Sequence, residues 1–322
     1  MTIWEAAEHG HLDLVRQYID NLSSKQDRTA LVNSREPSTD ATLLHLAITH
    51  TPMTCSPTTT TMDQAIEQRL QLVTLLLEHG ASASASNVYN VQAIHMVGLY
   101  IPRMSLPFLA VLLDHGADIN ARDGDGWTPL HYAARFCQPP DKVVQRLVAE
   151  GADIQAKDDT DGKSCLFSLI ANGDYLDCLR WMVETAKANI QLRGDFQFIS
   201  GKERYVIKQA SLVLQAVKYR RVAMLHYLVH DRFTYKKLRT VISLDELDQA
   251  RSLIQHDWHD ITHDLQHLTL LLEQDPHSLV SKQQRLLRLS TSSSFWPLIQ
   301  RSLTRHHNWI RKMGKIFINR LT

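Results

Sequence analysis

The sequence lacks long hydrophobic runs and the short motifs that mark the commonest catalytic sites. Its longest apolar stretch runs from Leu106 to Leu113, whereas a helix needs about 20 apolar residues to cross a bilayer. The phosphate-binding patterns GxGxxG and GxxxxGKS/T, the serine motif GxSxG and the zinc motif HExxH are all missing from the sequence. These absences argue against a membrane-spanning protein and against the enzyme classes that depend on those motifs.

Cysteine is scarce, and a secretion signal is missing. The cysteines, Cys55, Cys137, Cys165 and Cys178, stand too far apart for a CxxC motif, so we expect reduced thiols as in cytosolic or nuclear proteins. The first residues, Met1 to Glu8, contain neither a basic segment nor a long apolar segment. We therefore expect a cytoplasmic location, with the nucleus as an alternative, and no secretion.

An excess of charge of one sign is missing as well. The 35 Lys and Arg residues nearly balance the 34 Asp and Glu residues, and the formal net charge is +1. This balance argues against a basic nucleic-acid coat protein and against an acidic disordered tail. With 44% hydrophobic residues among 322, the chain can bury a sizeable core, and its length predicts one or two domains.

What the sequence does contain is an internal repeat. A Leu- and Val-rich segment that ends in Gly-Ala occurs three times, and its glycines are Gly80, Gly116 and Gly151. A second landmark, an aliphatic residue followed by His or Phe, occurs at Ile94-His95, Leu130-His131 and Leu166-Phe167. Both landmarks recur every 35 or 36 residues. Two unrelated landmarks with a shared period indicate a solenoid built from stacked units.

The clearest unit starts at Asp125 and reads D-G-W-T-P-L-H-Y-A-A. It resembles the ankyrin repeat, whose hallmark is T-P-L-H-x-A at a period near 33 residues. Gly126 suits a turn, and Thr128 and Pro129 suit the start of a helix. Gly151 suits the end of the second helix. The resemblance implies that each unit is a helix, a turn and a second helix, followed by a projecting hairpin.

Weaker copies of this unit extend the resemblance over residues 1–230. We therefore predict an all-α fold, an ankyrin-repeat solenoid of about six helix-turn-helix units with short hairpins, followed by a C-terminal helical extension. The array is expected at 1–240 and the C-terminal region at 241–322. Insertions are expected within the array at 21–41, 49–64 and 193–206, the last of them as a long hairpin.

The ankyrin resemblance implies a protein-binding module without catalysis, cofactor or metal, and we predict an adaptor or scaffold. Its contacts are expected on the concave face, from hairpin tips and the exposed side of each first helix. The predicted contact residues are Val88, Tyr89, Val91, Tyr100, Asp125, Trp127, Arg135, Phe136, Thr160, Asp161, Lys163 and Asn172. Trp127 and Phe136 are expected to act as anchors beside Arg135, unless they cover neighbouring insertions instead. No small-molecule substrate and no specific nucleic acid is expected.

Three histidines, His45, His95 and His131, recur at one position of the repeat. A recurrent position favours a structural role, in which each imidazole ties one hairpin to the next. A catalytic or metal-binding role for these histidines is the less favoured alternative.

The C-terminal region separates its charges into two blocks. Residues 244–275 carry a narrow apolar seam and a net charge of about −7, and we expect them to form one helix. Four histidines fall opposite this seam: His256, His259, His263 and His267. We interpret them as a solvated polar face, and the alternative is a zinc site, because His263 and His267 are four residues apart.

Residues 276–322 contain no Asp or Glu and carry nine Lys and Arg residues. A basic amphipathic helix is predicted over 295–321, with Trp309, Arg311, Lys312, Lys315 and Phe317 on its surface. We expect it to fold against the acidic helix, so that the apolar faces of the two helices cap the exposed end of the solenoid. The alternatives are an anionic membrane surface, calmodulin or a partner groove, and a separate alternative for the whole chain is an ankyrin-type transcriptional regulator.

Overall fold

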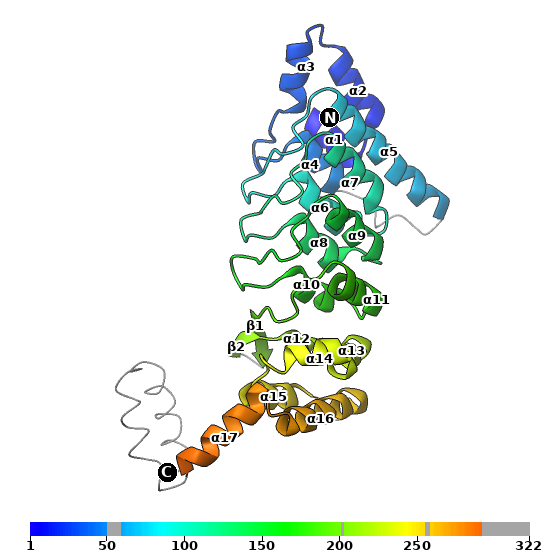
Figure 1. The fold of residues 1–322 in the computed structure, drawn as a ribbon. Helices are drawn as coiled ribbons and strands as arrows, with labels where there is room; N and C mark the ends of the chain where they lie inside the picture. Colours follow the sequence, from blue (N-terminus) through cyan, green and yellow to red (C-terminus); the bar gives the residue numbers. More distant parts are fainter. Residues whose placement is uncertain (50–58, 201–202, 255–257, 292–322) are drawn as a thin grey trace.

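The computed structural model describes residues 1–49, 59–200, 203–254 and 258–291. These residues form a stack of helix pairs, in which inner helices lie beside a column of loops and outer helices form a second row (Figure 1). Neighbouring helices contact each other along both rows. The prediction of an all-α solenoid is therefore confirmed.

The inner row contains six short helices before residue 240: α1 (Ile3–His9), α4 (Leu43–Thr49), α6 (Ala93–Tyr100), α8 (Pro129–Phe136), α10 (Cys165–Asn172) and α12 (Leu212–Lys218). Their partners in the outer row are α2 (Leu12–Asp20), α5 (Thr59–Glu78), α7 (Ser105–Asp114), α9 (Asp141–Ala149), α11 (Leu176–Arg180), which continues as the π-helix η1 (Trp181–Thr185), and α13 (Val222–His230). Within the described ranges these helices make the six pairs that the repeat predicts.

The recurrent glycines end the outer helices, as their spacing predicts. Gly80, Gly116 and Gly151 have φ angles of +90°, +82° and +100°, a conformation that side chains with a Cβ rarely adopt. After α7, the N–H of Gly116 donates to the carbonyl of Leu113 at 3.0 Å, and the next N–H donates to Leu112. This pairing satisfies carbonyls that the helix leaves free, and it explains why the period of the sequence is marked by glycine.

Small residues allow the inner helices to approach closely. A Cβ at Gly98 on α6 would stand 3.3 Å from backbone atoms of Tyr132 and Ala133 on α8. Ala133 and Ala134 are themselves buried. Between the rows, large apolar side chains fill a core that extends along the stack, and Phe108 and Phe167 are the largest of those that are fully buried.

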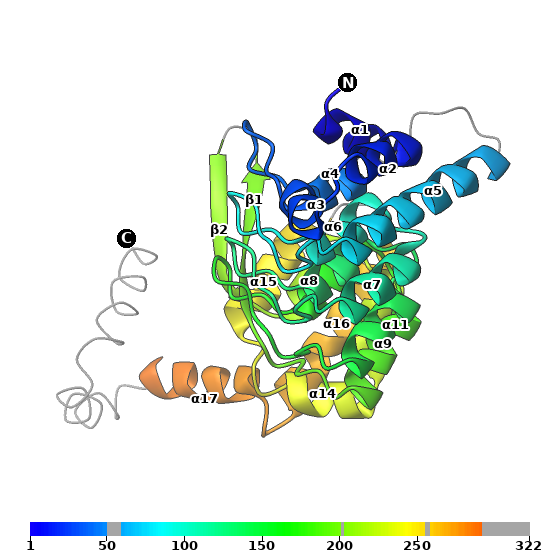
Figure 2. The ribbon, with the colours of Figure 1, turned by 90° about the horizontal axis from the view of Figure 1, so that it is seen from above.

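Loops project from the stack on the side of the inner helices. Several close with a short antiparallel bridge, as in Arg35–Thr42, Ser86–Gln92 and Lys157–Ser164. The insertion predicted at 193–206 takes the place of one such loop. It forms an antiparallel hairpin of β1 (Gly194–Ser200) and β2 (Glu203–Ala210). Figure 2, which looks along the stack, shows this hairpin on the loop side.

The other two predicted insertions, at 21–41 and 49–64, are described in full and in part, respectively. Residues 21–41 contain a helix, α3 (Lys25–Val32). Its N-cap is Ser24, whose side chain accepts from the N–H groups of Gln26 and Asp27. The insertion at 49–64 lies mostly outside the described residues. Its last part, from Thr59, already belongs to α5.

The acidic segment is two helices rather than the one that its apolar seam predicts. They are α15 (Leu244–Leu253) and α16 (His259–Gln274), and they pack against each other. Helix α15 also packs on α12, and α16 packs on α13, so both rows continue past residue 240. The division of the chain at residue 240 stays a prediction.

Two further helices complete the described chain: α14 (Arg232–Leu238) packs on α13, and α17 (Leu279–Thr291) packs on α16. The predicted basic helix 295–321 lies outside the described residues, together with Trp309, Arg311, Lys312, Lys315 and Phe317. Among the helices that the structure describes, none combines the length and the apolar character needed to cross a membrane.

Candidate protein-binding face

All twelve predicted contact residues lie on the loops or the inner helices of three consecutive units. We call the surface formed by residues 86–100, 122–136 and 157–172 the loop face. It faces the same side as the column of loops (Figure 1). The repeat therefore brings these residues onto one side of the stack. Their role as partner contacts stays a prediction, and their surroundings differ.

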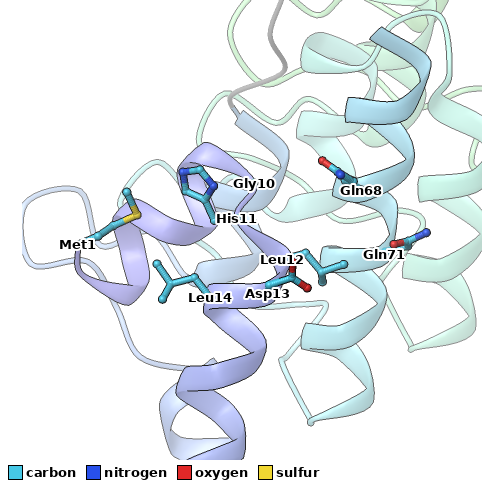
Figure 3. A pocket seen from close by; sticks show the side chains of 8 residues that line it. All are labelled: Met1, Gly10, His11, Leu12, Asp13, Leu14, Gln68 and Gln71. Atoms are coloured by element: carbon cyan, nitrogen blue, oxygen red, sulfur yellow. The ribbon is translucent and has the colours of Figure 1, made fainter. Parts of the chain in front are cut away.

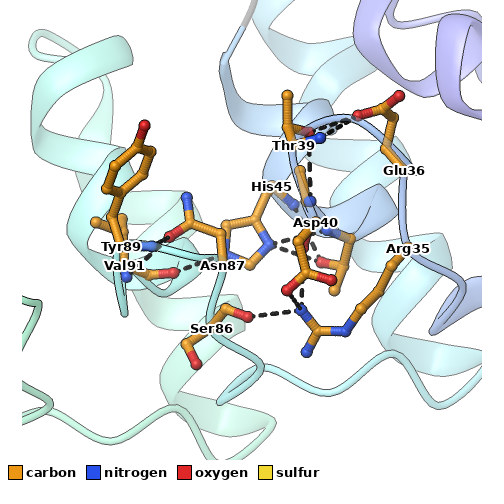
Figure 4. Close-up of polar contacts among 11 residues, drawn as sticks. Arg35, Glu36, Thr39, Asp40, His45, Ser86, Asn87, Tyr89 and Val91 are labelled. Atoms are coloured by element: carbon orange, nitrogen blue, oxygen red, sulfur yellow. Dashed lines mark hydrogen bonds and ion pairs between the residues drawn. The ribbon is translucent and has the colours of Figure 1, made fainter.

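The loop before α6 holds two apolar side chains in solvent. Val88 is 64% exposed and Tyr89 is 73% exposed. Asn87 fixes their backbone, because its Oδ1 accepts from the N–H groups of Tyr89 at 2.9 Å and Val91 at 3.1 Å (Figure 4). The carbonyl of Tyr89 also accepts from Gly124 in the next loop at 2.9 Å. The loop is thus held in place while it presents an apolar tip.

An aromatic cluster covers the middle of the loop face. Trp127 is half-buried and lies edge-on to Tyr132, with 5.6 Å between ring centroids, and 6.5 Å from the ring of Phe136. The guanidinium of Arg135 lies 5.2 Å from the centroid of the Phe136 ring, a distance suited to cation–π attraction. Trp127 is therefore one part of a packed aromatic surface rather than an isolated exposed anchor.

Tyr132 is a member of this cluster that the sequence did not single out. Its hydroxyl donates to Oδ2 of Asp123 at 2.8 Å, and burial, with this hydrogen bond, raises the pKa of the phenol. Tyr132 occupies the variable position of T-P-L-H-x-A. The aromatic residue at this variable position is the sequence signal that could have identified Tyr132 as part of the loop face. Tyr100, at the end of the preceding inner helix, is a second exposed aromatic residue of this face.

Contact residues of the fifth unit divide into tip residues and internal ties. Thr160 is exposed at the loop tip, whereas Asp161 and Lys163 are half-buried and form an ion pair at 2.5 Å. Asn172 uses its amide within the stack, because Nδ2 donates to the carbonyls of Ala134 at 3.0 Å and Cys137 at 2.9 Å. Asn172 thus supports the end of α8, and Thr160 is better placed to meet a partner.

The recurrent histidines tie each loop to the next, as predicted. Nε2 of His45 donates to the carbonyl of Val91 at 2.9 Å (Figure 4), and Nε2 of His95 donates to that of Ala121 at 3.0 Å. The third bond joins His131 to Lys163 at 3.2 Å. A carbonyl only accepts, so each Nε2 carries the proton. Burial lowers the pKa of all three imidazoles.

Arginine side chains add ties between loops that the sequence did not reveal. Nη1 of Arg35 pairs with Asp40 at 2.7 Å and donates to the carbonyl of Ser86 at 2.8 Å (Figure 4). Arg122 pairs with Asp159 at 2.7 Å. These contacts join neighbouring loops at positions outside the repeat motif, so only the assembled stack shows them.

A hollow of about 570 Å³ lies at the N-terminal end of the stack (Figure 3), and none of its lining residues belongs to the loop face. It is lined by Met1, Gly10, His11, Leu12, Asp13, Leu14, Gln68 and Gln71. His11 and Asp13 are the titratable side chains of this lining. Within the described part of the chain, a set of three metal-ligating side chains occurs on α13 and α16 instead, on the outer row.

Comparison with known proteins identifies the repeat. A family model described as ankyrin repeats (3 copies) matches residues 65–158 and also 101–194. The putative ankyrin repeat protein FPV233 of Fowlpox virus (strain NVSL) is 49% identical over 51 residues, or 16% of this chain and 10% of that protein. The B-cell lymphoma 3 protein of Homo sapiens is 37% identical over 106 residues, or 31% of this chain and 22% of that protein.

Two further similarities complete the comparison. The RelA-associated inhibitor of Mus musculus is 27% identical over 134 residues, or 41% of this chain and 16% of that protein. The crystal structure of the ankyrin repeat domain of Bcl-3, a unique member of the IkappaB protein family, matches with 25% identity and a TM-score of 0.49, over 71% of this chain and 85% of that one. The chain spans less than a quarter of each curated relative. The matched family model, the glycine-ended outer helices and the histidine ties agree, and residues 65–194 of the chain are ankyrin repeats.

Proposed function

We propose that this protein is a non-catalytic adaptor that binds a partner protein through its loop face. The observation that carries the proposal is the exposed pair Val88 and Tyr89 on a loop that is fixed by hydrogen bonds. Exposed apolar side chains on a rigid element favour association, because a partner can cover them at little entropic cost. Neighbouring aromatic side chains beside an arginine are typical of residues that dominate binding energy.

The shape of the array supports the same proposal. Stacked repeats present an extended surface that a partner can contact along several units at once. Tyr89, Trp127 and Thr160 lie in three successive loops of this surface. We therefore expect the partner to lie across three units, with an apolar segment over Tyr89 and the aromatic cluster.

A second candidate function is favoured by the name of one relative. The RelA-associated inhibitor is named for its association with RelA. We infer from it a narrower candidate, a regulator that inhibits a partner protein by binding it, which is one form of the ankyrin-type transcriptional regulator considered from the sequence. The membrane or calmodulin alternative rests on residues 295–321, and salt-dependent binding of the full chain to anionic liposomes tests it separately.

The proposal is tested by affinity capture with three forms of the full chain. The first is the unchanged protein, and the second is Val88→Ser/Tyr89→Ala. The third is the control Leu270→Ser, which alters an apolar side chain on α16 that is 55% exposed. A partner held through the loop face is expected to be captured equally by the first and third forms and at least tenfold less by the second. Equal capture of every partner by all three forms would contradict the proposal.

A further inference from the structure

Helices α13 and α16 bring histidines and a carboxylate together on the outer row. His226 and His230 lie one turn apart on α13. Nδ1 of His226 is 3.2 Å from Oδ1 of Asp264 on α16, and Nε2 of His230 is 2.9 Å from the same oxygen. The three ligand atoms all lie within 4.8 Å of one another. Two imidazole nitrogens and one carboxylate oxygen therefore converge from two helices.

The cluster is closed at its base and open at its rim. The side chain of Asp264 is 5% exposed, whereas those of His230 and His226 are 27% and 63% exposed. The ring of His267 stacks on that of His230, with 4.4 Å between centroids and 10° between planes, so it supports the His230 ring. The carboxylate therefore lies at the base of the cluster, and the histidine rings at its rim are open to solvent.

We propose that His226, His230 and Asp264 bind a divalent transition-metal ion, and that Zn²⁺ fits them best. With zinc–ligand bonds of about 2.0–2.1 Å in tetrahedral geometry, neighbouring ligand atoms stand about 3.3 Å apart. The two nitrogen–oxygen distances given above are close to this separation. Histidines four residues apart on a helix are a common zinc-binding pair, and three protein ligands leave a fourth position for water.

The donor atoms decide between classes of metal. Imidazole nitrogen suits zinc and its neighbours among the transition metals, whereas Mg²⁺ and Ca²⁺ are bound mainly by oxygen. The same atoms also permit a hydrogen-bonded cluster without metal, in which both imidazoles donate to Asp264. The zinc-bound site and the hydrogen-bonded cluster differ in their protons. Only zinc binding requires both ring nitrogens that face Asp264 to be free of protons.

Zinc at this position would join the outer helices of two successive pairs. Because α16 belongs to the segment after residue 240, the ion would fasten that segment to the rest of the stack. A metal that binds only the folded state also stabilises that state, and this stabilisation grows with the logarithm of the free metal concentration once the site is saturated. The proposed role of the ion is therefore structural, and it does not depend on the binding proposed for the loop face.

The test uses the full chain after treatment with EDTA and removal of the chelator. Calorimetric titration with ZnCl₂ is expected to show one site, and CoCl₂ is expected to give the visible absorption of a four-coordinate cobalt ion. The variant His226→Gln/His230→Gln should bind Zn²⁺ at least tenfold more weakly and lose the cobalt absorption. Asp264→Asn should also weaken binding, while a circular dichroism spectrum confirms that each variant is folded.

The control variant removes two histidines elsewhere. His9→Gln/His11→Gln alters a second stacked pair, whose ring centroids are 6.0 Å apart near the N-terminus, and it should leave the zinc affinity and the cobalt spectrum unchanged. Three results would overturn the proposal: no zinc binding by the unchanged chain, equal binding after the change at His226 and His230, or loss of the site in the control. Each of these results would leave the cluster as a hydrogen-bonded contact between α13 and α16.

Discussion

The Nε2 of His131 donates to the carbonyl of Lys163, 3.2 Å away in the loop of the following unit. On its other side, Nδ1 of the same ring accepts from the N–H of Thr128 at 3.2 Å. One buried imidazole therefore joins the start of α8 to the next loop. Because equivalent bonds occur at His45 and His95, this contact is the repeated link by which the loops are held in register.

Removal of the His131 ring should destabilise the fold. In His131→Ala the carbonyl of Lys163 and the N–H of Thr128 lose their partner in a buried position. An unsatisfied buried group costs about 1–3 kcal/mol, and we expect the free energy of unfolding to fall by about that amount. Urea unfolding measures it. The control His115→Ala, at an exposed ring, should change stability by less than about 0.5 kcal/mol.

The three buried histidines should make stability fall at mildly acidic pH. Burial lowers their pKa in the folded protein, so the unfolded chain takes up protons first as pH decreases. The stabilisation is complete above the ordinary histidine pKa of about 6.5, and below it each group contributes a slope of up to about 1.4 kcal/mol per pH unit. Urea unfolding at pH 7.5, 6.5 and 5.5 tests this.

His131→Gln isolates one of these groups, because glutamine does not titrate. This variant should lose less stability between pH 7.5 and 5.5 than the unchanged protein, although it starts from a lower value. If the two proteins lost the same amount over this range, the titration would arise elsewhere and the prediction would be wrong.

The sequence predicted the features that depend on local backbone conformation and that recur in each repeat unit. Gly116 and Gly151 end helices because only glycine readily adopts their positive φ. His131 repeats because each unit needs the same tie to the next loop. The hairpin of β1 and β2 was also predictable, since an insertion in the place of a loop cannot pack between helices.

The features that the sequence missed depend on which distant helix faces meet. The apolar seam of residues 244–275 predicted a single helix, and this prediction placed His263 and His267 on a solvated face. In the structure this segment is two helices, and Asp264 on the second of them faces α13. There it contacts His226 and His230, which the sequence did not single out. His267 is half-buried there, whereas the side chain of His263 is 77% exposed and His256 lies outside the described residues. Periodicity within one segment cannot reveal a partner on another.

Substitutions of Tyr132 should measure how much the aromatic cluster of the loop face contributes to the stability of the fold. Tyr132→Phe removes the hydrogen bond to Asp123 and keeps the ring, so it should cost about 1 kcal/mol of stability. Tyr132→Ala also removes ring contacts with His95, Trp127 and Phe136. Aromatic pairs contribute about 0.5–1.5 kcal/mol each beyond burial, so this variant should lose at least about 2 kcal/mol more.

The control for this series is Tyr89→Ala, which alters a ring that is 73% exposed and should change stability by less than about 0.5 kcal/mol. Thermal or urea unfolding ranks the three variants. A loss at Tyr89→Ala as large as that at Tyr132→Ala would mean that the loop tip is part of the core, and it would remove the main support for a binding role of this tip.

The ion pair of Arg193 and Glu246 should contribute far more to the stability of the fold than an exposed ion pair does. Nη2 of Arg193 lies 2.6 Å from Oε2 of Glu246, whose side chain is 5% exposed, and Oε1 accepts from the N–H of Ser211 at 2.6 Å. Arg193→Ala leaves a buried carboxylate without its cation, which costs about 3–5 kcal/mol. We expect the lower end of this range, because the arginine side chain is 23% exposed and solvent reduces the cost. We also expect faster hydrogen exchange in α15, the helix that carries Glu246.

Two further variants test whether the buried charge causes this loss: a control at an exposed ion pair elsewhere, and a double variant at Arg193 and Glu246. Arg146→Ala breaks a pair whose side chains are 45% and 43% exposed, and it should cost only about 0.3–0.5 kcal/mol. The double variant Arg193→Ala/Glu246→Gln should recover part of the loss, because an uncharged amide is less costly to bury and can still accept from Ser211. If the double variant were no more stable than Arg193→Ala, the loss would arise from the other contacts of the arginine, which are the packing of its stem and its hydrogen bonds to the carbonyls of Gln209 and Val241. The buried charge would then not be its cause.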